Sequence, residues 1–188
     1  MARQLLRAIL LTSNTPQFQP VTLYRSPIDA SPLDPPLAPH IQPGYYAGLV
    51  INTFIGKTGS SKIVELSVGD SNVSGYAAFE HGRLARAVFI NMHAWLASST
   101  GERPSVHIDL DFARGAVDEQ GEVNAFWQRK ATAKRLVIQR ADDLEGLTWA
   151  GQSWETRDIR PRGRLVTERV VLSEGIDLRS TEAVLIEF

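Results

Sequence analysis

The sequence predicts a mainly β protein, an antiparallel β-sandwich preceded by a proline-rich arm and one orphan helix. About seven short segments after residue 60 alternate apolar and polar residues between turn signals, as sandwich strands do. Eight of the ten prolines lie within residues 12–43, and the stretch that begins at Pro43 is apolar on nearly all sides. We therefore expect an N-terminal segment and arm over residues 1–42, a helix over 43–56 and a sandwich domain over 60–188.

Composition limits the kinds of function that the chain can have. A length of 188 residues suits one domain with a proper core. The net charge of -1 provides no basic field for nucleic acid, and the absence of cysteine excludes disulfides, thiolate metal sites and a cysteine nucleophile. Near the N-terminus, Arg7 interrupts an apolar run that makes a poor signal peptide and is too short for a transmembrane helix. We expect neither nucleic acid nor a membrane as partner.

The arm and the helix follow from local chemistry. Proline fixes φ and lacks an N–H donor, so the clustered prolines favour an extended surface arm over a helix or a central strand. Pro43 suits the first turn of a helix, and Gly56 suits its end. Between them the apolar residues form a stripe so wide that the helix needs partners on more than one side. These residues are Tyr45, Tyr46, Leu49, Val50, Ile51, Phe54 and Ile55.

From Lys62 onward the pattern is typical of strands. The segments "KIVELSV", "VSGYAAFE" and "RLARAVFIN" alternate, and the last two flank the turn "EHGR", in which Gly82 can adopt a positive φ. Further strands are predicted in "SVHIDLDF", "AKRLVIQ", "RLVTERVVLS" and "TEAVLIEF". Residues 113–129 have no clear period and are expected to form a long loop.

The strand "RAVFIN" ends in residue types that could serve a binding site. Its alternation is expected to bury Phe89 between the sheets and to turn Ile90 to the opposite face. Asn91, His93 and Trp95 then mark the point where the strand leaves the sheet. We predict that these three residues form hydrogen bonds in the exit loop and cover the edge of the core.

The sequence contains no recognisable catalytic or metal-binding constellation. Its four histidines lack ligand spacing, and there is no HExxH, no GxSxG and no glycine-rich loop between a strand and a helix. His107, Asp109 and Asp111 share one face of "HIDLD"; a carboxylate pair is one interpretation, and the solvated face of a half-buried strand is the simpler one. We predict no catalytic residue, no metal site and no cofactor. Asn72 begins an Asn-Val-Ser glycosylation sequon, which matters only in a secreted chain.

One loop contains residues that could contact a carbohydrate. In "GLTWAGQSWET", Trp149, Gln152 and Trp154 combine aromatic faces with an amide, and Trp95 and Tyr24 could extend such a surface. The alternative is that the indoles cap the sandwich core, since large aromatic side chains dominate core energetics. Nothing else in the segment indicates a pocket, which favours the core alternative.

Several segments taken together resemble a known family. "HIQPGYYAGLVINTFIG", "VELSVGDSNVSGYAAFEHGRLARAVFINMHAW", "RPSVHIDLDF", "KRLVIQRADDLEGLTWAGQSWET" and "TEAVLIEF" look like the C-terminal part of fungal glycoside hydrolase family 79, the β-glucuronidase-like proteins. The resemblance covers about residues 19 to 188, and the order and spacing of the segments make it specific. It implies a secreted enzyme with a catalytic (β/α)8 barrel, two catalytic glutamates within that barrel, and a β-sandwich after it.

All the segments that carry the resemblance lie on the sandwich side of this architecture. Residues 1–18 do not resemble the last barrel strand of the family, and the chain has no Asn-Glu dipeptide, the usual context of the acid/base residue. The resemblance therefore implies a non-catalytic C-terminal module whose helix is a remnant of the last barrel helix. Its expected partner is a catalytic barrel, or a second copy held through the apolar helix. The alternatives are a stand-alone carbohydrate-binding protein and an incomplete gene whose real product contains the barrel.

Overall fold

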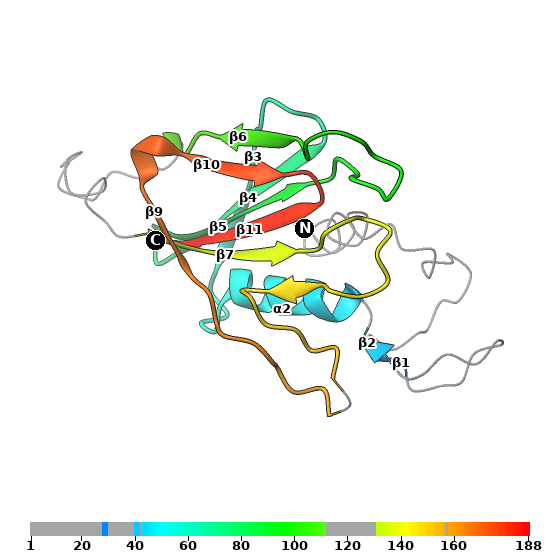
Figure 1. The fold of residues 1–188 in the computed structure, drawn as a ribbon. Helices are drawn as coiled ribbons and strands as arrows, with labels where there is room; N and C mark the ends of the chain where they lie inside the picture. The colour runs from blue at the N-terminus through cyan, green and yellow to red at the C-terminus, as the bar shows by residue number, and fades with distance from the viewer. Residues whose placement is uncertain (1–27, 30–39, 42, 112–130, 157) are drawn as a thin grey trace.

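The structure, a computed structural model, describes residues 28–29, 40–41, 43–111, 131–156 and 158–188 (Figure 1). The predicted loop over 113–129 and nearly all of the predicted arm lie outside the described residues. Within them the fold is mainly β, with antiparallel strand pairing throughout and one α-helix. The predicted fold class is confirmed.

Two antiparallel sheets form the body of the fold. The main sheet has seven strands, in the order β3-β4-β5-β11-β7-β8 with β9 also paired to β7. Their bounds are Lys62–Leu66, Val73–Glu80, Arg83–Asn91, Glu182–Glu187, Ala131–Val137, Thr148–Trp149 and, for β9, Glu168–Val170. The second sheet pairs β6 (Ser105–Ile108) with β10 (Ile176–Arg179). Two short strands, β1 (Ile28–Asp29) and β2 (His40–Ile41), pair with each other, and a 3-10 helix spans Leu172–Glu174.

The main sheet is covered on both faces, and each face has its own hydrophobic cluster. On one face, Val88 and Ile90 of β5 pack in the cluster that contains the helix. On the other face, Phe89 packs with Ile108 of β6 and Leu178 of β10. The side chains of a strand alternate between faces, so one strand serves both clusters. The predicted alternation of "RAVFIN" is confirmed.

The turn between β4 and β5 fixes the register of the central hairpin. His81 and Gly82 have φ values of 50° and 77°, the pair of positive φ angles that a two-residue type I′ turn needs. Phe79 lies opposite Leu84, and a register shift follows between Ala78 and Phe79. The expectation of a positive φ at Gly82 is confirmed.

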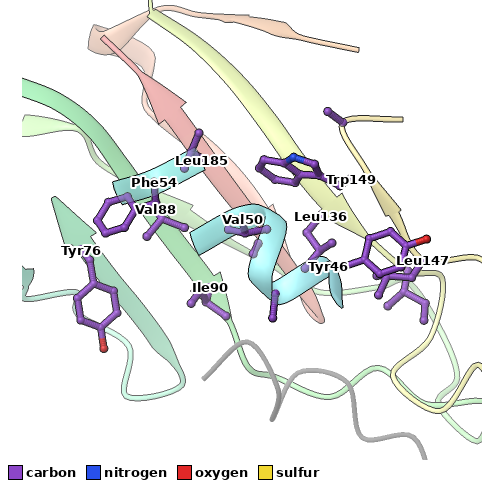
Figure 2. Packing of buried hydrophobic residues seen from close by; sticks show 14 of the residues in the cluster. Tyr46, Val50, Phe54, Tyr76, Val88, Ile90, Leu136, Leu147, Trp149 and Leu185 are labelled. Carbon is purple, nitrogen blue, oxygen red and sulfur yellow. The ribbon is translucent and has the colours of Figure 1, made fainter. Parts of the chain in front are cut away.

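Helix α2 (Pro43–Ile55) lies across one face of the main sheet (Figures 1 and 2). Tyr46 and Phe54 are completely buried on the sheet side, whereas Tyr45 and Leu49 are half-buried. Gly56 ends the helix with a φ of 76°. The sequence predicted that one sheet could not cover the whole stripe, and the division into buried and half-buried residues agrees. No helix in the described ranges is long and apolar enough to cross a membrane.

Arg86 of β5 attaches the end of this helix to the sheet. Its Nε donates to the Phe54 carbonyl at 2.7 Å and its Nη2 donates to the Ile55 carbonyl at 3.2 Å. These carbonyls lie in the last turn, where the helix dipole is negative and favours a cation. Arg86 also pairs with Glu80, and this hydrogen bond lowers the pKa of the Glu80 carboxyl. The helix is therefore held by polar contacts as well as by its apolar face.

A charged group lies in the opposite interface, between the two sheets. Glu182 of β11 is almost fully buried, with Arg103 and Arg135 at 3.8 Å and 3.5 Å from its carboxylate oxygens. Arg103 Nε also donates to the Ser180 carbonyl at 2.8 Å. Removing one partner of such a group leaves an uncompensated buried charge, which is costly. The alternation of apolar and polar residues in the sequence did not predict this cluster of charged side chains.

Two strand predictions need correction. The predicted strand over 105–112 ends at Ile108, and within the predicted strand over 164–173 only Glu168–Val170 pairs. Residues 164–167 are exposed and lie outside any strand, and Leu172 and Ser173 belong to the 3-10 helix, so only three residues of this segment pair with β7. Strand β10 (Ile176–Arg179) was not predicted, although Ile176 and Leu178 alternate into the core.

Candidate functional site

The loop that carries Trp149, Gln152 and Trp154 is built on a tight hairpin. Trp149 N donates to the Gln152 carbonyl at 2.9 Å, and Gln152 N donates back to the Trp149 carbonyl at 3.0 Å. Between them Ala150 and Gly151 have φ values of 50° and 74°, again those of a type I′ turn. A Cβ at Gly151 would lie 2.8 Å from a backbone oxygen, so glycine is required by space as well as by φ. The turn fixes the positions of the two tryptophans.

Trp149 is a core residue. Its side chain is 6% exposed and belongs to the same cluster as Val50 and Leu136. Figure 2 shows its indole beside the helix, among these residues. A buried indole offers no free face for stacking on a sugar ring. For Trp149 the structure therefore favours the core alternative.

Trp154 lies against the first turn of the helix. Its ring centroid is 5.8 Å from that of Tyr46, edge to face, and 6.3 Å from that of Tyr45. Trp154 N donates to the Tyr46 hydroxyl at 2.9 Å, and Ser153 Oγ lies 3.2 Å from the same hydroxyl. Burial raises the pKa of Tyr46, so its phenol stays neutral and can donate. These contacts join the loop to α2 and leave the Trp154 side chain half-buried.

Gln152 is half-buried and interacts with the neighbouring segment. Its Nε2 donates to the Gly163 carbonyl at 3.4 Å. The backbone of Ser153 is bridged to Arg162 by two hydrogen bonds of 2.8 Å and 2.9 Å. The amide that was a candidate for carbohydrate contact therefore helps to hold this loop against residues 162–163.

Trp95 lies in the exit loop after β5, as the sequence predicted. Its N donates to Thr181 Oγ1 at 2.9 Å and its carbonyl accepts from Ala141 N at 2.7 Å. Asn91 is buried, donates through Nδ2 to the Leu178 carbonyl at 3.0 Å and accepts from His93 N at 3.0 Å. The predicted hydrogen bonding of this loop is confirmed. Trp95 belongs to neither hydrophobic cluster, so the prediction that it covers the edge of the core is wrong, and it does not join Trp149 and Trp154.

The cavity beside the first turn of α2 is too small for a sugar. It has a volume of about 10 Å³, which accommodates about one water molecule. Tyr46, Leu147 and Glu155 are among its lining residues. The Glu155 carboxylate accepts hydrogen bonds from Gly146 N at 2.8 Å and Leu147 N at 3.2 Å, so it serves the adjacent turn.

A larger cleft of about 540 Å³ lies between β6 and the segment before β4. Apolar residues that include Phe89 and Val106 line it together with the polar residues Asp70, His107 and Asp109. His107 and Asp109 are exposed while Ile108 and Leu110 are buried, so the predicted alternation of "HIDLD" and its solvated face are confirmed, although the strand itself ends at Ile108.

His107 occupies the space between two carboxylates. Its Nδ1 is 2.8 Å from Asp177 Oδ1, and its Nε2 is 3.6 Å from Asp109 Oδ1. Both carboxylates are exposed, Asp109 by 82% and Asp177 by 72%. The hydrogen bond to Asp177 raises the pKa of His107, and the Asp109 charge adds to the shift. This arrangement is a surface ion cluster, and the imidazole leaves no room for a scissile bond between the carboxylates.

The raised pKa of His107 predicts a pH-dependent contribution to stability. The folded state favours the protonated imidazole, so this contribution is complete below the ordinary pKa of about 6.5 and is lost as the pH rises through the raised value. We expect Asp177→Asn to lower the urea midpoint slightly near pH 6 and to have no effect near pH 9. When the same Asp177→Asn change is made in a His107→Gln background, the urea midpoint should not change at either pH. An effect of Asp177→Asn that is equal at both pH values would contradict this assignment.

Fold and site together define a β-sandwich domain with one docked helix. The part of the chain that the structure describes contains no group of three or more histidine, aspartate and glutamate side chains able to hold a metal ion. Residues 75–185 match the model of the glycosyl hydrolase family 79 C-terminal beta domain. This match spans more than half of the chain, and the chain belongs to that family.

The chain is similar to a curated β-glucuronidase and to a solved glucuronidase structure. The β-glucuronidase of Neurospora crassa is 24% identical over 142 residues, which cover 62% of this chain and 25% of that protein. A crystal structure of a 4-O-α-L-rhamnosyl-β-D-glucuronidase from Fusarium oxysporum 12S, in complex with Rha-GlcA, superposes with a TM-score of 0.60 at 18% identity. That superposition covers 79% of this chain and 30% of the other, and it shows a shared fold. The chain thus spans about a quarter of the length of its curated relative.

Proposed function

We propose that this chain is a non-catalytic β-sandwich module that supports the catalytic barrel of a β-glucuronidase-like glycosidase. The observation that carries the proposal is the match of residues 75–185 to the C-terminal beta domain of the family. Retaining hydrolysis needs two carboxyl groups roughly 5 Å apart across the scissile bond. The family resemblance places both carboxyl groups in a barrel, whereas the described residues form open antiparallel sheets and one α-helix.

The helix is the element that we propose to face the barrel. Its buried side is already occupied, because Tyr46 and Phe54 pack on the main sheet and Arg86 holds its last turn. Tyr45 and Leu49 lie beside that buried side and remain half-buried. Covering half-buried apolar residues with a second domain would bury further apolar area, which is favourable. Self-association through the same residues is the alternative use of this surface.

A stand-alone carbohydrate-binding protein has weaker support. Of the five residues named for sugar contact, Tyr24 lies outside the described residues, Trp149 is buried and the amide of Gln152 is hydrogen-bonded to Gly163. Trp154 keeps a partly exposed ring, but Tyr45 and Tyr46 pack against it. The cavity next to this loop is smaller than a sugar.

Calorimetric titration with methyl β-D-glucuronide separates the two functions. The module proposal predicts no heat of binding beyond dilution, because no described aromatic face is both free and joined to a sugar-sized cavity. Saturable heat that disappears in Trp154→Ala, and persists in a Trp95→Ala control, would establish carbohydrate binding at the hairpin loop instead. Folding of both variants is checked by circular dichroism before the titration.

A further inference from the structure

Asn72 is the first residue of the sequon Asn72-Val73-Ser74. No other Asn-x-Ser/Thr triplet occurs among the 188 residues of the sequence. The structure places Asn72 in the turn that leads into β4, where its side chain is exposed. Ser71 before it is exposed as well. A sequon in an exposed turn is accessible to solvent, and a bulky glycan needs such an accessible position.

The backbone of this turn is fixed on both sides. Asn72 N donates to Asp70 Oδ1 at 2.8 Å, and Val73 N donates to the Asp70 carbonyl at 3.1 Å. The Asn72 carbonyl accepts from Met92 N at 2.8 Å, which joins the turn to the end of β5. Among the described residues, the turn is therefore held by backbone groups and by the Asp70 carboxylate. The amide of the Asn72 side chain makes no hydrogen bond with any described residue.

Asn91 provides a direct contrast, because it lies on the adjacent strand opposite Val73. The Asn91 side chain is completely buried, donates to the Leu178 carbonyl and accepts from His93 N. Asn91 is thus needed to satisfy buried backbone groups. No hydrogen bond joins the Asn72 side chain to the described residues, so modification of its amide would break none of the hydrogen bonds described for this part of the fold.

The geometry points to Asn72 as an acceptor for an N-linked glycan when the chain enters the secretory pathway. The co-reactant is a lipid diphosphate-linked oligosaccharide. The Asn72 Nδ2 forms a bond to the anomeric carbon of the first sugar while the bond from that carbon to the diphosphate oxygen breaks. One amide proton is lost and the lipid diphosphate leaves. This inference does not depend on the proposed function.

A glycan at Asn72 would also restrict where a partner can dock. It would extend from the end of the main sheet where β4 begins and β5 ends, beside the hydrogen bond of 3.0 Å between His93 Nε2 and Asp70 Oδ2. A bulky hydrated oligosaccharide keeps a protein surface away from its base. A partner would then have to use another face, such as the one that carries α2.

The test is secretion of the full chain from yeast behind a cleavable leader, followed by intact mass measurement. We expect a heavier, heterogeneous species that collapses to one mass on treatment with peptide-N-glycosidase, with conversion of Asn72 to aspartate. Asn72→Gln and Ser74→Ala should give the unmodified mass, and Ser74→Thr should keep the glycan. Because Asn72→Gln changes an exposed side chain that forms no hydrogen bond with the described residues, it remains decisive if Ser74→Ala is not secreted. An unmodified mass for the secreted wild type, or a glycan that persists in Asn72→Gln, would overturn the inference.

Discussion

Replacing Phe89 by alanine is expected to lower the free energy of unfolding by about 3–5 kcal/mol, as removal of a buried aromatic ring does. Phe89 is 1% exposed and packs between the two sheets with Ile108, Leu178 and Val184. Its ring also covers Gly75 on the neighbouring strand, where a Cβ would lie only 2.8 Å from Phe89 Cε1. The ring of Phe89 therefore occupies the space that the missing side chain of Gly75 leaves. We expect that the strands would not collapse to fill the cavity left by Phe89→Ala.

The measurement is the urea midpoint of the purified chain, with Val64→Ala as the matched control. Val64 lies on edge strand β3 and is largely exposed, so its truncation should change the free energy of unfolding by less than about 0.5 kcal/mol. An unchanged midpoint for Phe89→Ala would show that the register or the buried face of β5 is wrong.

Truncation of Phe54 to alanine is expected to have a comparable effect, about 3–5 kcal/mol, but to act on the opposite face of the sheet. Phe54 is completely buried and belongs to the cluster that contains Tyr76 and Val88 (Figure 2). It lies in the last turn of α2, next to the carbonyls that Arg86 binds. Loss of its ring should therefore loosen the helix end together with the apolar contact.

Asn52→Ala is the control on the same helix, since Asn52 is exposed and its truncation should leave the midpoint within about 0.5 kcal/mol of wild type. Near-ultraviolet circular dichroism gives a second readout, because Tyr46 and Trp154 lie edge to face where the helix meets the hairpin loop. If Phe54→Ala unfolds at the same urea concentration as Asn52→Ala, the helix does not contribute to the stability of this domain.

The strands of the central hairpin could be predicted because their pattern and their turn agree. The alternation of residues 73–80 and 83–91 and the glycine at position 82 all favour the same register. The segment 164–173 looked equally regular, yet Leu165, Val166 and Val171 are exposed. The alternation of a segment indicates which side chains it could bury. How many of its residues form a strand depends on how much of the edge of β7 is free to pair, and this depends on the tertiary fold rather than on the local sequence.

For the candidate site, too, the sequence indicated the types of residue but not their exposure. The aromatic and amide residues of the hairpin loop were recognisable by type, but their exposure depends on where α2 lies. Tyr46 reaches Trp154 across more than a hundred residues of sequence, and Trp149 is buried by the same helix. The ion cluster around Glu182 was not visible either, because Arg103 and Arg135 come from distant segments. A single sequence identifies such residues only after the sheets have been paired.

The most direct test of the proposed function is hydrolysis of 4-nitrophenyl β-D-glucuronide by the purified chain. We expect no release of nitrophenol above that of buffer, because the resemblance places both catalytic glutamates in a barrel, and the described carboxylates on either side of His107, Asp109 and Asp177, form an exposed ion cluster. The chain is first shown to be folded by its urea transition, so that inactivity cannot be attributed to unfolding. Turnover that persists through successive purification steps and is abolished by substitution of one glutamate would contradict the assignment of a non-catalytic module.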